Sequence, residues 1–380
     1  MDSKEQKEKV KLKTINVKSK KDIEFDFFGS SLGFTLPSGI QEAKFYPQSK
    51  KGINNFFNTL LGIEYEVLLS EIKKKSFELN LNDWGKYLLI KSTSEKIFSS
   101  QNDSRLLEWF LFNKLGYSLR VGLANKHIVV MYESKKTIYN TPRYTINKKN
   151  FYILSNYASK GSENIFTYKQ NYPEANKLFD LSMDSLPNLE KNLKIKKLRF
   201  RIHMKKYAIE YRYNQNLIDF MATYPQADYD TFFNAPLDKG SYQDIVNALR
   251  KYINGRKSSN AINFVLHFVQ NAFKYEVDMK QFAREKVMFA DETLFYDKSD
   301  CEDRAILFAR LVKDIFKIAV VGVQYSNHMT TALHIPIKGD IIRVNSRKYV
   351  IADPTYKNAS LGQNMNRYKS KKPKRFIFLK

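Results

Sequence analysis

Hydrophobic and polar positions alternate with a helical period over residues 301–316. The apolar residues recur at spacings of three and four, at Ala305, Phe308, Ala309, Val312, Ile315 and Phe316. Asp300 is placed to cap the first turn, and Asp303 follows at the position that completes a capping box. We therefore predict a largely buried helix whose first residue is Cys301.

Related patterns predict a mixture of helices and strands elsewhere. Helices are expected around 53–73, after Asn82 or Asp83, over 104–115 with Gly116 as C-cap, after Ser241, and over 261–272. Strand-like segments are expected at 23–28, 119–123, 127–132, 150–154, 198–202, 207–213, 318–325, 329–335 and 348–352. The sequence thus favours an α+β fold.

The chain of 380 residues is long enough for two or three domains, each with its own core. A lysine-rich, flexible tail is expected at 1–22, and an N-terminal domain at 23–160. A connecting α/β region at 161–245, with a short helix near 175–181, leads to a C-terminal domain at 246–380. No apolar run is long enough for a transmembrane segment.

Basic residues outnumber acidic ones by 64 to 39, which gives a net charge of +25. Such a charge is typical of nucleic-acid or anionic-surface binding, but no nucleic-acid motif accompanies it. Lys, Asn, Ile, Phe and Tyr are all abundant and share A/T-rich codons, so mutational bias is a competing explanation. We therefore do not favour nucleic acid as the main partner, and an acidic protein partner stays open.

Cys301 is the only cysteine, so the chain cannot form an intramolecular disulfide. A lone cysteine is more often a small buried hydrophobic residue than a reactive one. The start of a helix favours a thiolate, whereas the adjacent Asp300, Glu302 and Asp303 oppose it. A nearby imidazolium is therefore needed for reactivity.

His328 and Asp353 follow Cys301 in the chain, His328 before a predicted strand and Asp353 after another. A single hairpin centred on Gly339-Asp340 places the two side by side, while a turn at Asn345-Ser346 gives a different register. Acyl transfer by a thiol enzyme uses three groups. They are a cysteine nucleophile, a histidine base and a carboxylate that orients the imidazole.

Three segments carry a resemblance to the transglutaminase-like superfamily of papain-related thiol enzymes, closest to the transglutaminase-like proteins of Bacteroidetes. They are Ser299-Asp-Cys-Glu-Asp-Arg304, Asn327-His-Met-Thr-Thr-Ala-Leu333 and Ile351-Ala-Asp-Pro-Thr-Tyr356. The likeness to the Bacteroidetes proteins extends through 268–275, 292–294 and 79–84, and a looser similarity runs from about residue 23 onward. The resemblance implies a papain/transglutaminase-like core, in which the cysteine heads a helix packed on an antiparallel sheet, within a catalytic domain at 246–380.

By this resemblance Cys301 is the nucleophile, His328 the general base and acid, and Asp353 the orienting carboxylate. Gln270 is a candidate oxyanion donor, with buried structural hydrogen bonding as the alternative. His334 has a structural role by its position, and His127, His203 and His267 lack the neighbours of a zinc site. We expect neither a metal nor a cofactor.

The two halves of the chain resemble one another at an offset of about 200 residues. Residues 106–127 correspond to 305–328, and 150–154 correspond to 348–352. The cysteine position then falls within 100–102 and the aspartate position near Ser155. The N-terminal domain is on this hypothesis a degenerate transglutaminase-like repeat, and chance similarity of a helix followed by strands is the alternative.

The sequence supports two candidate functions. The first is a cysteine peptidase, amidase or transglutaminase-type acyltransferase that forms a thioester with a protein or peptide substrate and acts on a peptide bond or a glutamine amide. The alternative is a catalytically silent scaffold with the same fold and a basic surface. Because the first residues are not followed by a signal-type apolar region, the sequence favours the cytoplasm, or export if a leader precedes it.

Overall fold

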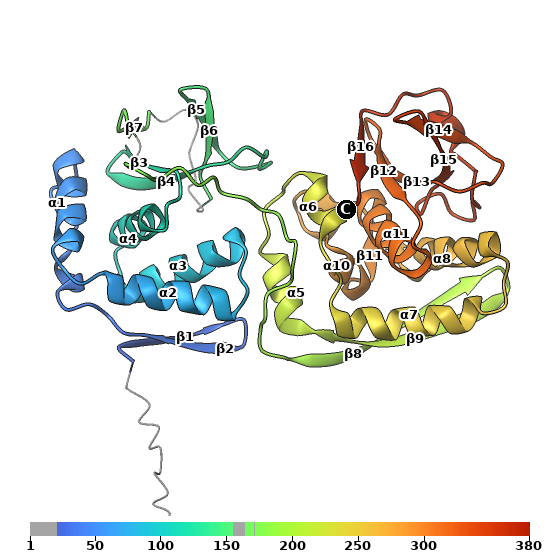
Figure 1. The fold of residues 1–380 in the computed structure, drawn as a ribbon, viewed down its shortest axis with the longest axis horizontal. Coiled ribbons are helices and arrows are strands. Elements are labelled where there is room, and N and C mark those ends of the chain that lie inside the picture. Colours follow the sequence, from blue (N-terminus) through green and yellow to red (C-terminus); the bar gives the residue numbers. More distant parts are fainter. Residues whose placement is uncertain (1–20, 155–163, 171) are drawn as a thin grey trace, which may run out of the picture.

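Two five-stranded antiparallel sheets, one in each half of the chain, define the fold (Figure 1). The computed structural model describes residues 21–154, 164–170 and 172–380. Apart from Lys21 and Asp22, the tail expected at 1–22 lies outside the described residues. The architecture is a mixed α+β fold, as the hydrophobic pattern predicts.

The N-terminal half begins with a hairpin and continues through helices into its sheet. The hairpin is β1 (Ile23–Phe27) with β2 (Ser30–Phe34). The helices are α1 (Lys50–Leu61), α2 (Glu66–Glu78), α3 (Asp83–Ile97) and α4 (Gln101–Lys114). The strands are β3 (Leu119–Ala124), β4 (His127–Glu133), β5 (Arg143–Ile146), β6 (Lys149–Tyr152) and β7 (Phe166–Thr167).

The C-terminal half repeats this plan. Its long hairpin, β8 (Leu193–Ile202) with β9 (Lys205–Asn214), precedes α5 (Gln215–Ala222), α6 (Tyr229–Asn234), α7 (Lys239–Ile253) and α8 (Ser258–Ala272). Next come β10 (Lys274–Tyr275), α9 (Asp278–Gln281), α10 (Ala290–Phe295), β11 (Lys298–Ser299) and α11 (Cys301–Phe316). The sheet contains β12 (Val320–Gln324), β13 (Met329–Leu333), β14 (Ile341–Val344), β15 (Arg347–Ala352) and β16 (Arg375–Phe378).

The repeat suspected from the sequence extends to the strand order of both sheets. The order β5-β6-β4-β3-β7 in the first sheet matches β14-β15-β13-β12-β16 in the second. Leu119 pairs with Tyr132 in the first sheet, and Val320 pairs with Leu333 in the second. Both residues of the second pair therefore follow their counterparts in the first pair by the same number of positions. The C-terminal half differs by an extra segment, residues 273–300, between α8 and α11.

Two expectations from the sequence are wrong. Residues 172–192 contain no helix, although a short one was expected over 175–181. The expected boundary at 245/246 falls inside α7, so the C-terminal half begins earlier, with the hairpin of β8 and β9. Hydrophobic periodicity identifies α7 but does not show which half it joins, because that depends on packing against β9.

The helix that begins at Cys301 forms for the reasons that the sequence suggests. The Asp300 amide donates to Asp303 Oδ2 at 3.2 Å, which is one half of the predicted capping box. Ala305, Phe308, Ala309 and Val312 are buried on the side that packs against β12 and β13. The apolar face therefore anchors α11 in the core of the C-terminal half.

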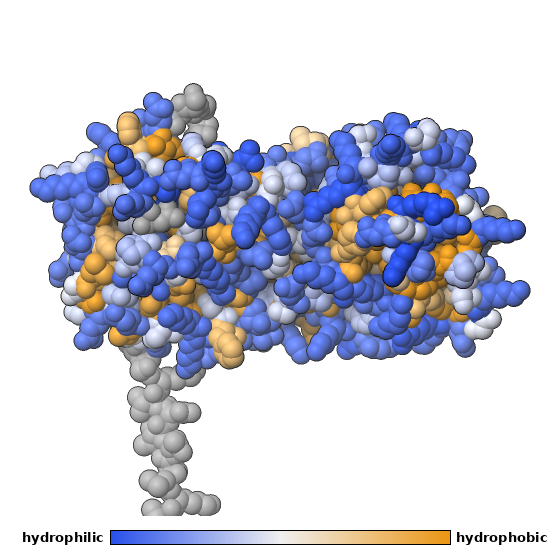
Figure 2. All heavy atoms as spheres, turned by 45° about the horizontal axis from the view of Figure 1, so that its top comes forward, coloured by the Kyte–Doolittle hydropathy of each residue, from blue (hydrophilic) through white to orange (hydrophobic). Residues whose placement is uncertain are grey.

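The face drawn in Figure 2 is largely hydrophilic, with smaller apolar areas on both halves of the molecule. Alternate residues of β12 divide between two cores: Val320 joins the main core, while Val321 and Val323 join a smaller cluster on the opposite face of the sheet.

Within the described ranges, the helices are too short or too polar to cross a membrane.

Candidate active site

Cys301 is half-buried as the first residue of α11. The backbone amide of Met329, the residue after His328, donates to the Cys301 sulfur. The thiol itself donates to Glu302 Oε2 at 3.0 Å. The structure therefore brings Cys301 to the start of β13, beside His328, and gives its proton an acceptor on a neighbouring carboxylate.

His328 is buried and oriented by two contacts. Its Nε2 lies 2.9 Å from Asp353 Oδ2, and its ring stacks on Tyr368 with centroids 4.9 Å apart. The Tyr325 amide donates to the His328 carbonyl at 2.8 Å and closes the turn that presents the ring. Because Nε2 is bonded to Asp353, Nδ1 is the ring nitrogen left for proton exchange with a thiol.

Asp353 is fully buried at the end of β15. Its Oδ1 accepts from the amides of Thr355 and Tyr356, at 2.9 and 3.1 Å, while Oδ2 faces His328. The backbone therefore fixes the carboxylate so that one oxygen remains directed at the imidazole. Such an arrangement sets the tautomer of a histidine and supports a positive charge on it.

The strand pairing that brings His328 to Asp353 differs from the single hairpin considered for residues 329–352. The turn at Asn345-Ser346 joins β14 to β15, and β15 lies between β14 and β13. Thr331 pairs with Ala352. The single hairpin that sets His328 opposite Asp353 would instead pair Thr331 with the residue two positions before Ala352. A shift of two leaves every side chain on its original face, so His328 and Asp353 still meet.

Gln270 does not act as an oxyanion donor in this arrangement. Its Nε2 donates to the carbonyls of Asp353 and Ala359 at 2.9 and 3.0 Å, which uses both amide hydrogens. Its Oε1 lies 2.8 Å from His267 Nδ1. Gln270 therefore ties the chain after β15 to α8, which is the structural alternative.

Acidic side chains surround the thiol. Asp278, Asp300 and Glu302 each place one oxygen within 4.8 Å of the others, close enough to share a metal ion with hard oxygen ligands. Burial raises the pKa of Asp278 to about 6, and burial together with Asp303 and Glu302 raises the pKa of Asp300. Burial and the repulsion from neighbouring carboxylates therefore favour the protonated forms of Asp278 and Asp300.

Burial raises the pKa of the Cys301 thiol well above its usual range, and the charges of Glu302 and Asp300 raise it further. The amide of Met329 opposes this shift only in part. Burial and the neighbouring acids therefore favour the neutral thiol over the thiolate. This answers the question left by the sequence, in which the helix N-terminus and the adjacent acids pull the pKa in opposite directions.

Replacing Glu302 by glutamine is expected to make Cys301 more reactive. The change removes a negative charge next to the sulfur, so the thiol pKa falls. The rate of alkylation by iodoacetamide, measured against pH, should then rise at a lower pH than in wild type. Asp314→Asn, on the last turns of the same helix, is the control, and a profile shifted equally by both changes contradicts the role of Glu302.

Three residues near the thiol were missed by the sequence analysis, namely Tyr229, Tyr368 and Asp278. Burial raises the pKa of Tyr229, and its electrostatic interaction with Glu302, Cys301 and Asp300 raises it further, which places this residue of α6 beside the thiol and the acids. Tyr368 supports the imidazole from residues beyond the last family-like segment. None of the three stands in a motif, so only the fold identifies them.

The cysteine-equivalent position of the N-terminal half has no thiol. There the amide of Ile128, the residue after His127, donates to Asn102 Oδ1 at 2.8 Å, just as Met329 donates to Cys301. His127 is exposed at the corresponding turn, and the position matching Asp353, near Ser155, lies outside the described residues.

Comparison of the chain with models of known protein families, with curated proteins and with solved structures found no match.

Proposed function

We propose that the protein is a thiol enzyme that transfers or hydrolyses acyl groups, with a peptide bond or a glutamine side-chain amide as substrate. The observation that carries this proposal is the buried pair of His328 and Asp353, 2.9 Å apart, next to a cysteine at the start of a helix. A transglutaminase-like core and a degenerate N-terminal copy belong to the same proposal.

The first step is attack of the Cys301 sulfur on the acyl carbon, with transfer of the thiol proton to His328 Nδ1. Asp353 stabilises the imidazolium that forms. The backbone amide of Cys301 begins α11 and lacks an acceptor within the helix, so it is the donor that we assign to the oxyanion. His328 then returns the proton to the departing nitrogen, which leaves a thioester on Cys301.

The second step decides the product. Water attacks the thioester with His328 as base in hydrolysis, and an amine attacks in transamidation. We favour hydrolysis because water needs no second binding site. In both cases the contact between the thiol and Glu302 has to be exchanged for one with His328 before the first step, since a protonated thiol is a poor nucleophile.

The neutral thiol bonded to Glu302 also favours a second candidate, a scaffold that keeps the fold without turnover. Incubation with a peptide library, followed by mass spectrometry for cleavage and by an assay for released ammonia, separates the two. Cleavage or deamidation that Cys301→Ala eliminates supports the enzyme. A wild-type protein that neither turns over peptides nor reacts with an acylating probe supports the scaffold.

A further inference from the structure

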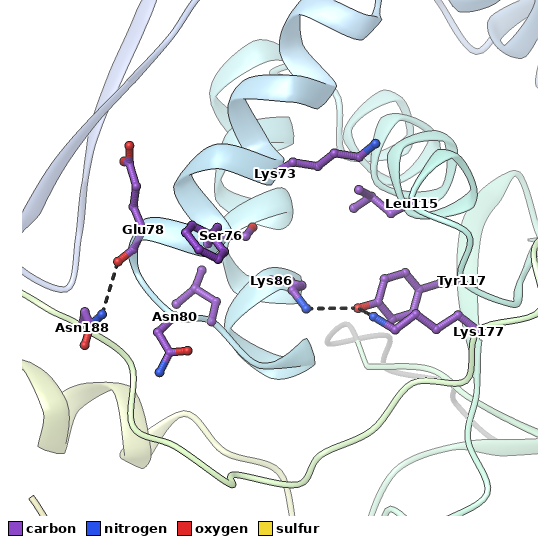
Figure 3. Close-up of a pocket in the computed structure, with 11 residues that line it drawn as sticks. Lys73, Ser76, Glu78, Asn80, Lys86, Leu115, Tyr117, Lys177 and Asn188 are labelled. Atoms are coloured by element: carbon purple, nitrogen blue, oxygen red, sulfur yellow. Dashed lines mark hydrogen bonds between the residues drawn. The ribbon is translucent and has the colours of Figure 1, made fainter.

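A pocket of about 630 Å³ lies in the N-terminal half, well apart in the sequence from Cys301, His328 and Asp353 (Figure 3). It is formed by the end of α2, the start of α3, the residues after α4, and the extended segment that contains Lys177 and Asn188. Pockets of this size hold small organic ligands.

Two lysines converge at one side of this pocket. Lys177 Nζ lies 2.5 Å from the Tyr117 hydroxyl and 3.5 Å from Asp83 Oδ1. Lys86 Nζ lies 3.5 Å from the same hydroxyl and 3.3 Å from the same Asp83 oxygen. Tyr117 is fully buried and donates to Asp83, so its hydroxyl and this carboxylate form a fixed support for both ammonium groups.

The two ammonium groups of Lys86 and Lys177 share a single carboxylate, that of Asp83. Burial and Asp83 hold the pKa of Tyr117 far above its usual range, so the phenol is neutral. Asp83 is then one negative charge shared by two ammonium groups, and its Oδ2 is already bonded to the Asp180 amide at 3.1 Å. Burial lowers the pKa of Lys177, and the neighbouring Lys86 lowers it further against the effect of Asp83. One positive charge therefore remains uncompensated.

Glu78, the other acid at the pocket, does not supply the missing charge. Its carboxylate is bonded to Lys75 Nζ at 2.9 Å, and in Figure 3 it lies on the far side of the pocket from Lys86. Its backbone carbonyl instead accepts from Asn188, which closes that end of the pocket. The surplus charge of the two lysines is therefore available to a ligand.

The rest of the lining mixes polar and apolar side chains: Lys73, Ser76, Asn80 and Asn188 are polar, and Phe77, Leu81 and Leu115 are apolar. Phe77 is 87% exposed although it is a large hydrophobic residue, and it stands at the pocket with Leu81 and Leu115. Ligand pockets combine apolar side chains with a few placed polar groups, and here Phe77, Leu81 and Leu115 stand beside the two lysines.

We propose that this pocket binds an organic monocarboxylate that carries an apolar group, either a small free acid or the C-terminus of a peptide. The carboxylate lies between Lys86 and Lys177, whose two charges Asp83 only partly balances, and the apolar group packs on Phe77. Phosphate lacks the apolar group that would make this second contact.

Titration of the full-length protein by calorimetry and ligand-detected NMR tests this site. Phenylpropionate is expected to bind about tenfold more tightly than acetate, because its ring buries apolar surface on Phe77. Phenylpropionamide and inorganic phosphate are expected to bind more weakly than phenylpropionate. A peptide ending in phenylalanine, compared with its C-terminal amide, distinguishes the two sources: tighter binding of the free-acid peptide than of phenylpropionate identifies a peptide terminus.

Three variants and a control complete the test. Lys86→Gln and Lys177→Gln should each weaken phenylpropionate binding about tenfold. Phe77→Ala should abolish the preference for phenylpropionate over acetate without loss of stability, since the ring is exposed. Lys74→Gln, on the same helix but outside the pocket, should change nothing. Equal binding of acid and amide, stronger binding of phosphate, no binding by wild type, or unchanged affinity in Lys177→Gln overturns the proposal.

Discussion

Cys301→Ala is expected to abolish both covalent labelling by an acylating probe and turnover of any substrate of the wild-type protein. The sulfur is the only nucleophile of its kind in the chain, so the loss in turnover should be on the order of 10⁴- to 10⁶-fold. The change should leave the fold intact, because Cys301 is half-buried at the first position of its helix and the capping contact between Asp300 and Asp303 does not involve its side chain.

Variants of His328 and Asp353 show whether the sulfur works with its neighbours. Asp353→Asn keeps an oxygen for the amides of Thr355 and Tyr356 but turns an NH₂ group toward His328 Nε2. This favours the wrong tautomer and should slow acylation by on the order of 10³- to 10⁴-fold. His328→Ala should have an effect at least as large.

His334→Ala is the matched control, because His334 is exposed just beyond β13 and its Nδ1 contacts only the Lys348 carbonyl. It should label at the wild-type rate. If His328→Ala at neutral pH also labels as fast as wild type, Cys301 is not activated by the imidazole and the proposed mechanism is wrong.

Lys286→Met is expected to cause the largest loss of stability among single substitutions of charged residues near the site. Lys286 Nζ lies 2.7 Å from Glu292 Oε1, and both side chains are buried. Removing the lysine leaves a buried carboxylate without its counter-charge, which costs about 3–5 kcal/mol of the free energy of unfolding. Chemical denaturation monitored by circular dichroism measures this cost.

The pH dependence of this loss has a definite sign. Burial raises the pKa of Glu292, and Lys286 lowers it. Without the lysine, the folded-state pKa rises further above the unfolded value, so the penalty is small in acid, where the carboxyl is protonated, and grows as the pH increases toward neutrality.

Lys298→Met is the comparison, since Lys298 pairs with Glu276 at 3.4 Å while its own side chain is 45% exposed. An exposed pair of this kind contributes about 0–1 kcal/mol. The double change Lys286→Met with Glu292→Gln should recover part of the loss. Equal effects of Lys286→Met and Lys298→Met contradict the importance of the buried pair.

The predictions from sequence succeed where local interactions determine the structure. The helix over 301–316, its caps and its buried face follow from the spacing of apolar residues and from Asp300 and Asp303. The strands at 119–124 and 127–133 and those at 320–324 and 329–333 coincide with short, mainly apolar segments that the sequence predicts as strands. The similarity of the two halves was visible because it preserves the order and spacing of these elements.

The predictions fail or stay open where distant residues compete for the same partner. The sequence allows two turns between His328 and Asp353, and only pairing of β15 with both β13 and β14 selects Asn345-Ser346. Gln270 is a plausible oxyanion donor as a residue type, but the carbonyls of Asp353 and Ala359 take both of its hydrogens. The boundary at 245/246 fails because the hydrophobic pattern does not reveal which hairpin covers α7.

By itself, the sequence determined that this protein has one thiol at the start of a capped helix, followed in order by a histidine and an aspartate on strands. Chain order, spacing and capping are local properties, so they can be read from neighbouring residues. The tertiary structure alone decided that His328 meets Asp353, that the thiol is bonded to Glu302 among acids that raise its pKa, and that two lysines share the carboxylate of Asp83. These features depend on burial and on charges brought together from distant parts of the chain, and therefore arise only when the chain is folded.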